Sequence, residues 1–261
     1  MCLILFAWKA HERFPLVLAA NRDEFYDRPS APAAFWEDEP DLLAGRDLRD
    51  GGTWLGITRS GRLAALTNYR DPASLKAGAP SRGALTSDYL RGRESPKAHL
   101  DRIGPAADRY NGFGLVCGNR DELFFYSNRG GRERVPAGVH GLSNRLLDTP
   151  WPKVERGKGA LRELLEGKDG PSPGALFEIL QDRTRPPDEQ LPETGVGIEW
   201  ERILSPLFIE SPAYGTRSST VLLIDREGVV TFIERVFNGR TEPRAERRFD
   251  FRIGDVSKNK G

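Results

Sequence analysis

The chain has 261 residues, of which 38% are hydrophobic, so it can bury the core of one large domain or two modest ones, and we expect one domain over residues 1–261. The 39 Lys and Arg residues nearly balance the 38 Asp and Glu residues, so the net charge does not favour nucleic acid or an anionic membrane as the partner. Two cysteines exclude a disulfide framework, and no Cys or His residues have zinc-ligand spacing, so we expect no metal and no cofactor.

The first apolar run, residues 3–8, is too short to span a bilayer and has no basic segment before it. We therefore expect neither a signal peptide nor a membrane span. With so few cysteines, a reducing compartment fits, and the sequence favours a cytoplasmic protein that acts on a small molecule.

Strand-like segments follow one another in pairs along the chain. LILFAW and FPLVLAA are nearly continuous apolar runs around KAHER, which predicts a hairpin whose strands are buried on both faces. Three more hairpins are predicted at TWLGITRSGRLAALTNY, GFGLVCGNRDELFFYS and STVLLIDREGVVTFIERVF, each with turn residues at its centre. These pairs predict antiparallel sheets.

Helical stretches lie between the predicted hairpins. Helices are expected over residues 83–90, 96–103, 151–167 and 173–180, the second and fourth opening with Ser-Pro. Residues 182–197 are polar and proline-rich and predict a flexible loop or flap, and residues 240–261 predict a solvated tail. Strands on both sides of the helical stretches favour an α+β fold of stacked antiparallel sheets covered by helices.

The first predicted hairpin brings a charged motif to the N-terminus. If its turn is centred near His11 and Glu12, residues that face each other have numbers summing to about 23 or 24. Cys2 then lies opposite Asn21 to Arg22, with Asp23 one step further along the strand. The sequence therefore predicts that the motif NRDE, residues 21–24, meets the start of the first strand.

This placement suits a cysteine nucleophile. Aminopeptidases generally remove an initiator Met when the next residue is small, so Cys2 is expected to carry both a thiol and a free α-amino group in the mature chain. An α-amino group can take the proton of a thiol, and a neighbouring guanidinium such as that of Arg22 favours the thiolate. Asp23 is placed to orient the thiol or the ammonium.

Acyl transfer also needs donors for the negative charge that develops on the attacked carbonyl oxygen, and Asn amides can serve. Two asparagines follow strand-like runs, Asn68 in ALTNYR and Asn144 in GLSNR. Arg217 in YGTRSST could clamp a substrate carboxylate or support the thiolate. The alternative for each residue is structural: a core cysteine, a charged strand end or an ordinary turn.

Five motifs in order carry a resemblance to a known family. The segments MCLILFAW, LAANRDEFYDRP, DGGTWLGIT with GRLAALTNYR, GLSNRLLDTPWPKV and YGTRSSTVLLID resemble the NRDE protein family, also called the Transport and Golgi organization protein 2 family. The resemblance runs from residue 2 to about residue 237. It implies that nearly the whole chain has the fold of that family.

More distantly, the candidate residues Cys2, Arg22, Asp23, Asn68, Asn144 and Arg217 are similar in order and type to the site of the choloylglycine hydrolase and penicillin V acylase group. That resemblance implies an N-terminal-nucleophile (Ntn) hydrolase fold, a four-layer αββα sandwich, and a cysteine amidase. In that group the Arg and Asp are not adjacent, whereas Arg22 and Asp23 are, so a bulge or a turn beginning at Arg22 is required for both to point the same way.

Two classes of function follow. In the first, Cys2 attacks an amide carbonyl of a small acylated substrate and the acyl-enzyme is then hydrolysed. In the second, the same fold carries a small molecule such as haem, a lipid or an acyl-CoA, as the resemblance to the NRDE family also implies, with Cys2 as a soft ligand for haem iron or without a role. The sequence leaves the substrate and the oligomeric state open.

Overall fold

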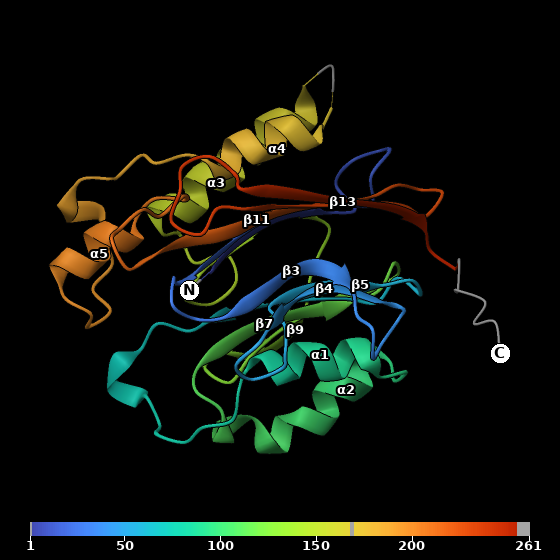
Figure 1. Cartoon of the computed structure of the whole chain (residues 1–261), viewed down its shortest axis with the longest axis horizontal. Coiled ribbons are helices and arrows are strands. Elements are labelled where there is room, and N and C mark those ends of the chain that lie inside the picture. The colour runs from blue at the N-terminus through green and yellow to red at the C-terminus, as the bar shows by residue number, and fades with distance from the viewer. Residues whose placement is uncertain (1, 168–169, 255–261) are drawn as a thin grey trace.

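The computed structural model describes residues 2–167 and 170–254, and for Cys2 it describes the backbone only. Two antiparallel sheets lie face to face at the centre of the molecule, as Figure 1 shows. Within the described residues, sheet A has six strands, in spatial order β10 (Gly138–Leu142), β1 (Cys2–Trp8), β2 (Leu16–Phe25), β11 (Tyr214–Ile224), β12 (Val229–Val236) and β13 (Ala245–Arg252).

Sheet B follows the chain order. Over the same described part of the chain, it contains β3 (Ser30–Phe35), β4 (Leu42–Asp47), β5 (Leu55–Thr58), β6 (Leu63–Asn68), β7 (Phe113–Gly118), β8 (Leu123–Ser127) and β9 (Gly131–Arg134). Each strand pairs with the next, and the connections are short except the one between β6 and β7, which spans residues 69–112.

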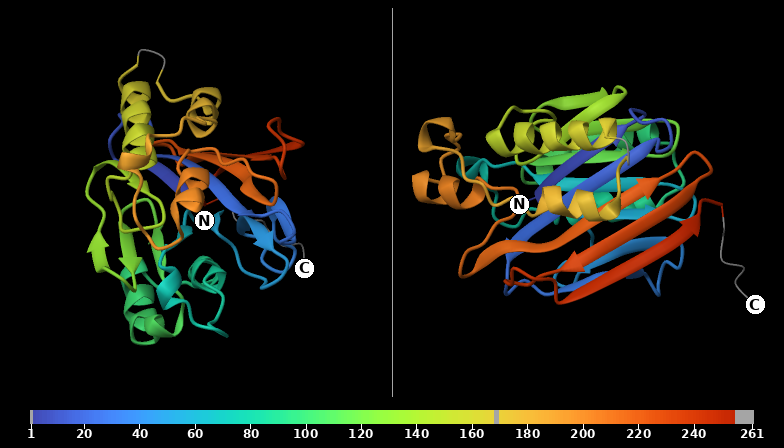
Figure 2. Two further views of the ribbon diagram at one scale, coloured as in Figure 1. Left: turned by 90° about the vertical axis from the view of Figure 1, so that its left-hand side faces the viewer. Right: turned by 90° about the horizontal axis from the view of Figure 1, so that it is seen from above.

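Helices cover the outer face of each sheet. Helices α3 (Pro152–Glu166) and α4 (Pro173–Leu180) pack on sheet A, and α1 (Gly83–Arg91) and α2 (Pro96–Ile103) pack on sheet B (Figures 1 and 2). The short helix α5 (Ile198–Leu204) lies at the end of the molecule where β1 begins (Figure 1). The architecture is the predicted α+β fold, a four-layer αββα sandwich.

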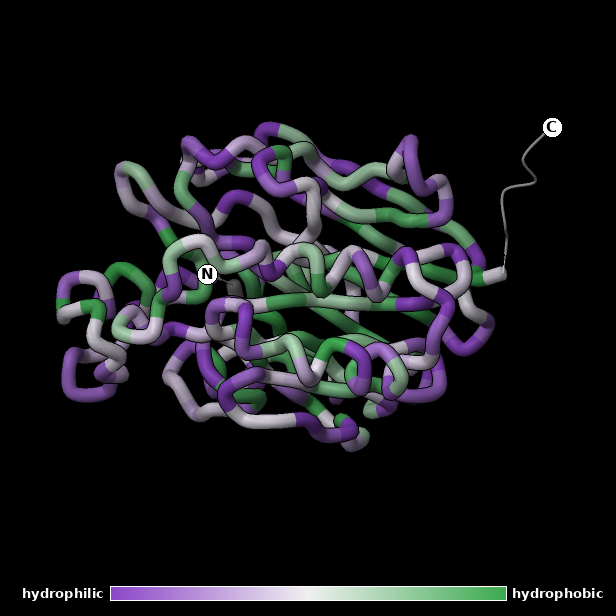
Figure 3. Tube along the Cα trace, turned by 90° about the horizontal axis from the view of Figure 1, so that it is seen from below, coloured by the Kyte–Doolittle hydropathy of each residue, from purple (hydrophilic) through white to green (hydrophobic). Residues whose placement is uncertain are grey.

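The first hairpin shows why its sequence is apolar throughout. Ile4 and Phe6 face the core between the two sheets, whereas Leu3 and Leu5 face the core beneath α3 and α4. Because side chains of a strand alternate between faces, a strand in a middle layer must be apolar at every position. Figure 3 shows that hydrophobic chain lies mostly toward the centre of the molecule. Each such side chain contributes about 1.5–3 kcal/mol by burial.

The four predicted hairpins are confirmed as β1–β2, β5–β6, β7–β8 and β11–β12. Strand β3 was not predicted because it contains Pro32. This proline occupies an irregular position at the edge of sheet B, where a missing N–H is tolerated. Helix α5 escaped it because its sequence IEWERIL follows a polar loop and is only two turns long.

Part of the expected tail is ordered as a strand. Residues 245–252 form β13, which pairs with β12 at the edge of sheet A. Phe249 and Phe251 pack against the core between the sheets while the residues between and before them are exposed. The alternation of charged residues with Phe249 and Phe251 therefore marks an edge strand, which corrects the expectation of a solvated tail at these positions. Residues 255–261 lie outside the described residues.

Candidate functional site

The first hairpin places Cys2 opposite Arg22. In the register of β1 and β2, Cys2 pairs with Arg22 and Leu3 pairs with Asn21, so facing residues sum to 24 as predicted. The side chain of Cys2 and the whole of Met1 lie outside the described part of the chain. The backbone register nevertheless brings the NRDE motif to the start of β1.

Arg22 is a buried cation, with a relative exposure of 7%. Its guanidinium carbon lies 4.1 Å from the centre of the Trp54 ring, and Nη1 donates to Ser30 Oγ at 3.4 Å. Among the residues that the structure describes, no carboxylate forms an ion pair with Arg22. Because a buried charge is costly without a counter-charge, this arrangement favours an anion beside Arg22.

Asp23 points to the opposite face of β2. It is 1% exposed, and its Oδ1 accepts a hydrogen bond from the hydroxyl of Thr216 at 2.7 Å. Burial raises the pKa of Asp23 to about 6, and the charge of Lys153 and the Thr216 hydrogen bond limit the rise. The pKa of Asp23 is therefore closer to neutral pH than that of an exposed aspartate.

No bulge or turn begins at Arg22, so Arg22 and Asp23 point to opposite faces of β2, as adjacent residues of a regular strand must. Strand β2 is continuous to Phe25, and the irregularity lies in β11, between Thr216 and Ser218, across from Arg22 and Asp23. Arg22 therefore contacts Trp54 between the sheets, whereas Asp23 contacts Thr216 on the face toward α3. Adjacent strand residues must alternate, and the extra residue of the bulge, Arg217, is on the partner strand.

The side chain of Asn21 makes structural contacts with neighbouring elements. Its side-chain N–H groups donate to the main-chain oxygens of Leu180 and Leu207 at 2.8 and 2.9 Å, and its Oδ1 accepts from Ser219 at 2.6 Å. The asparagine of the motif thus fixes the end of α4 to sheet A.

The two candidate asparagines meet, although they are far apart in the sequence. Asn144 Nδ2 donates to the main-chain oxygen of Asn68 at 2.9 Å. Asn144 is fully buried, whereas Asn68 is partly exposed at the end of β6 and lines the cavity described below. This contact uses one of the two N–H groups of the Asn144 amide.

A buried ion pair that the sequence did not indicate supports Asn144. Arg70 Nη2 donates to Asn144 Oδ1 at 3.3 Å, and the same guanidinium forms an ion pair with Glu201 of α5. Both side chains are 4% exposed. In the sequence, only the position of Arg70 two residues after Asn68 suggests that it belongs to the site. No pattern around Glu201 suggests the same, because Glu201 follows a polar loop.

The sequence pattern also did not predict that Lys153 belongs to the site. It begins α3, is buried, and its Nζ donates to the main-chain oxygen of Leu204 at 2.9 Å. Its charge lowers the pKa of Asp23 against the effect of burial. A lysine in the first turn of an amphipathic helix is usually solvated, so the sequence pattern did not single it out.

Arg217 fixes the backbone next to Arg22. Its Nη1 donates to the main-chain oxygens of Phe25 at 2.6 Å and Arg28 at 3.0 Å, and Nε donates to Asn238 Oδ1 at 2.6 Å. It lines a small cavity of about 70 Å³ behind Arg22 together with Glu234, and is not part of the larger cavity. These contacts hold the connection between β2 and β3 in place.

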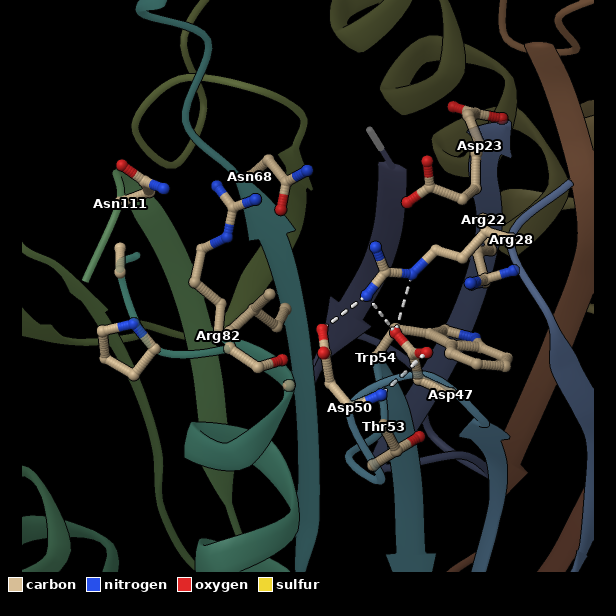
Figure 4. Close-up of a pocket in the computed structure, with 16 residues that line it drawn as sticks. Arg22, Asp23, Arg28, Asp47, Asp50, Thr53, Trp54, Asn68, Arg82 and Asn111 are labelled. Atoms are coloured by element: carbon tan, nitrogen blue, oxygen red, sulfur yellow. Dashed lines mark hydrogen bonds and ion pairs between the residues drawn. The ribbon is translucent and has the colours of Figure 1, made fainter. Parts of the chain in front are cut away.

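A second cavity beside Arg22 has a volume of about 210 Å³, larger than the one that Arg217 lines (Figure 4). Most of the residues that line it are polar or charged; they are Arg22, Asp23, Glu24, Arg28, Asp47, Asp50, Thr53, Asn68, Ser81, Arg82 and Asn111. The apolar side chains of the lining are Trp54, Leu66, Ala79 and Pro80. Three of the six predicted site residues, Arg22, Asp23 and Asn68, therefore line one cavity.

Groups of three or more His, Cys, Asp or Glu side chains that could hold a metal ion are not found within the described residues. In the same part of the chain, every helix is too short or too polar to cross a lipid bilayer.

Comparison with known proteins then identifies the family. The family model for Transport and Golgi organisation 2 matches residues 1–239. This chain belongs to that family. The Transport and Golgi organization protein 2 homolog of Bos taurus is 37% identical over 94% of this chain and 96% of its own length. The Homo sapiens homolog is 36% identical over 90% and 92%.

A solved structure shares the fold of this family member. A mutant of the conjugated bile acid hydrolase from Clostridium perfringens superposes with a TM-score of 0.53, covering 96% of this chain and 92% of the hydrolase, at 9% sequence identity. The likeness shows the Ntn-hydrolase fold. The family resemblance and the αββα architecture expected from the sequence are thus both confirmed.

Proposed function

We propose that this chain is an N-terminal-cysteine amidohydrolase that cleaves the C–N bond of a small acylated substrate through an acyl-enzyme. The observation that carries the proposal is the pairing of Cys2 with Arg22, a buried guanidinium that forms no ion pair among the described side chains. A thiolate at Cys2 would supply the anion that this charge favours.

The chemical steps assign a role to each candidate residue. The thiolate of Cys2 attacks the carbonyl carbon, and the side-chain amide of Asn68, which lines the cavity, donates to the oxygen that becomes negative. The buried Asn144 positions Asn68 through its hydrogen bond to the Asn68 main-chain oxygen. The C–N bond then breaks, and the leaving amine takes a proton from the α-ammonium group of Cys2. Water next attacks the thioester, and the carboxylic acid leaves as the thiol regains its proton.

Asp23 and Arg217 act beside these groups. Asp23, with its pKa near 6, lies one residue beyond Arg22 and orients the ammonium group of Cys2 in the proposal. Arg217 holds the backbone at Phe25 and Arg28, which keeps the end of β2 fixed relative to the cavity. Its role is therefore the positioning of Arg22 and not contact with the substrate.

The lining of the cavity favours this function over carriage of haem or an acyl chain. Sites for large apolar ligands are lined mainly by hydrophobic and aromatic side chains. Here charged groups and amides dominate, and Trp54 already contacts Arg22.

The nucleophile is tested by two substitutions. Cys2→Ala should abolish cleavage of a panel of acyl amides, whereas Cys2→Ser should retain slow turnover. The control is Cys117→Ala, which changes a fully buried thiol in sheet B and should leave turnover near the parent value. The mass of the intact protein should show loss of Met1. Parent-like turnover by Cys2→Ala, or full activity in protein that retains Met1, would refute the proposal.

A further inference from the structure

The cavity beside Arg22 has two chemically different walls. Figure 4 shows Asn68, Arg82 and Asn111 on one side, and Asp47, Asp50 and Thr53 on the other. The volume of about 210 Å³ and the polar lining suit a small polar molecule.

The first wall presents hydrogen-bond donors. Arg82 precedes helix α1, and its Nη1 donates to the main-chain oxygen of Gly112 at 3.0 Å, which fixes the guanidinium beside Asn111. Asn68 and Asn111 line the cavity next to it, and Asn111 Nδ2, which donates one N–H to the main-chain oxygen of Lys76 at 3.4 Å, has a second N–H for a ligand. A guanidinium flanked by amides recognises a carboxylate.

The second wall presents acceptors that are held rigidly. Arg28 Nη2 lies 2.6 Å from both Asp47 Oδ2 and Asp50 Oδ2, and Asp47 Oδ1 accepts from the main-chain N–H of Arg49 at 2.9 Å. Two carboxylates share one guanidinium, so Asp47, Asp50 and Arg28 together carry one net negative charge. Asp50 is the more accessible of the two, with a side-chain exposure of 37% against 14% for Asp47.

Arg22 adds an independent indication of a ligand at the inner end of this cavity. It lines the cavity, is nine-tenths buried, and forms no ion pair within the described part of the chain. A substrate that reaches Arg22 with its reactive carbonyl has its other end between the two walls.

We propose that the cavity binds the head group of a small zwitterionic amide, an amino-acid derivative of the γ-glutamyl type. Its α-carboxylate lies against Arg82 and Asn111, its α-ammonium group faces Asp50, and its side-chain amide reaches Cys2. This inference names the substrate class and rests on the proposed function for the cleavage step, in which the amide C–N bond breaks and glutamate and an amine are released.

Binding is measured by calorimetry on the full chain carrying Cys2→Ala. The probes are γ-L-glutamyl methylamide, its α-methyl ester, its N-acetyl derivative, and N-methylbutanamide, which lacks both charges. The zwitterion should bind at least about tenfold more tightly than each singly blocked form, because each blocked form loses one charged contact with the protein.

Two substitutions assign the walls. Arg82→Gln should remove the preference for the free acid over the methyl ester, and Asp50→Asn should remove the preference for the free amine over the N-acetyl form. Arg91→Gln is the matched control, because Arg91 is at the other end of α1 and pairs with Asp38. If Arg82→Gln fails to fold, Asn111→Ala tests the same wall, and the comparison of the four probes stands without any variant.

The outcomes separate this inference from the proposed function. Equal affinity for all four probes, or tighter binding of N-methylbutanamide, would overturn the zwitterion assignment even if the parent chain cleaves amides. Selective binding of the zwitterion without cleavage by the parent chain would support the ligand class and reject the amidase.

Discussion

At the scale of single residues, Arg22 distinguishes this site from a structural strand end. An exposed arginine next to Asp23 and Glu24 would form surface ion pairs of little energetic consequence. Instead Arg22 is buried against Trp54, opposite the backbone of Cys2 and beside a polar cavity. Arg22 should therefore favour the thiolate of Cys2, and the reactivity of that thiol can be measured without knowing the substrate.

Arg22→Gln should raise the pH at which iodoacetamide alkylates Cys2, by about one to three units, because the neighbouring positive charge that favours the thiolate is lost. The rate is followed by mass spectrometry of the intact protein. Cys117 should remain silent near neutral pH, since burial raises its pKa to about 12.

Arg46→Gln is the matched control for this measurement. Arg46 also stacks on a tryptophan, Trp36, with its guanidinium carbon 4.3 Å from the ring centre, but it lies on β4 and not beside Cys2. An identical pH profile for the parent and Arg22→Gln chains would contradict the proposed role of Arg22.

Some residues of the site could be predicted from the sequence and others could not. The hairpin register placed Arg22 and Asp23 near Cys2, because residues on paired strands have a fixed spacing. Arg70, Lys153 and Glu201 come from separate elements, and no spacing rule connects them. Only packing in three dimensions brought their charges into one buried region.

At the scale of elements, helix α5 is fixed to the rest of the molecule by Glu201. Its carboxylate pairs with Arg70 beyond the end of β6, and it also accepts from the main-chain N–H of Thr194 at 3.2 Å, in the loop expected to be a flap. The contact therefore connects α5, this loop and the strand that carries Asn68.

Glu201→Gln should lower the free energy of unfolding by about 3 kcal/mol, because it leaves the buried Arg70 without its carboxylate. Urea unfolding measures the change. Glu199→Gln on the same helix should change it by no more than about 0.5 kcal/mol, since the Glu199 side chain is 78% exposed. Equal effects of the two substitutions would show that the buried ion pair does not stabilise the fold.

A second contact between elements joins the two sheets. Glu234 on β12 accepts a hydrogen bond from the main-chain N–H of Ala33 on β3 at 2.6 Å. Burial raises the pKa of Glu234 to about 7, and the Ala33 hydrogen bond and the charge of Arg22 oppose the rise.

This carboxyl predicts a pH dependence of stability. Between pH 4.5 and 7 the folded chain holds a proton on Glu234 that the unfolded chain has released, so the free energy of unfolding should fall as pH rises. The slope from this group is at most about 1.4 kcal/mol per pH unit. Glu234→Gln keeps an acceptor for Ala33 and should remove this part of the slope.

Urea titrations at several pH values test the prediction. Asp23→Asn serves as the comparison, because its carboxyl should contribute a slope only between pH 3.8 and about 6. A Glu234→Gln chain with the same pH profile as the parent would show that Glu234 is not protonated in the folded state.

At the scale of the whole molecule, one core joins the layers. Residues of both sheets, including Phe6 and Phe232 of sheet A and Ile57 and Val116 of sheet B, form a single buried cluster. Neither sheet can keep its inner face buried without the other.

We therefore predict that the chain unfolds as one cooperative unit, as expected for a single domain. Tryptophan fluorescence reports on all five tryptophans, including Trp54 between the sheets and Trp151 next to α3, and it should give the same urea midpoint as far-ultraviolet circular dichroism. Two separate midpoints would show that the sheets are independent units, and the expectation of one domain over residues 1–261 would be wrong.

The sequence by itself determined the local pairings. Alternating or continuous apolar runs with turn residues between them identified four hairpins, and the short turn of the first one set the register of Cys2 against Arg22. These features depend on neighbours along the chain, whose spacing is fixed by strand geometry. Stacked antiparallel sheets covered by helices could be predicted at the same level, whereas the αββα architecture was implied by the family resemblance.

The tertiary structure alone decided which groups share the site. It placed the bulge in β11 and not at Arg22, turned Arg217 toward main-chain oxygens, and paired Asn144 with Asn68 across two loops. It also gathered Arg82, Asp50 and Arg22 around one cavity. The physical reason is that burial, and the pairing of charges which burial requires, depend on contacts between residues distant in the chain.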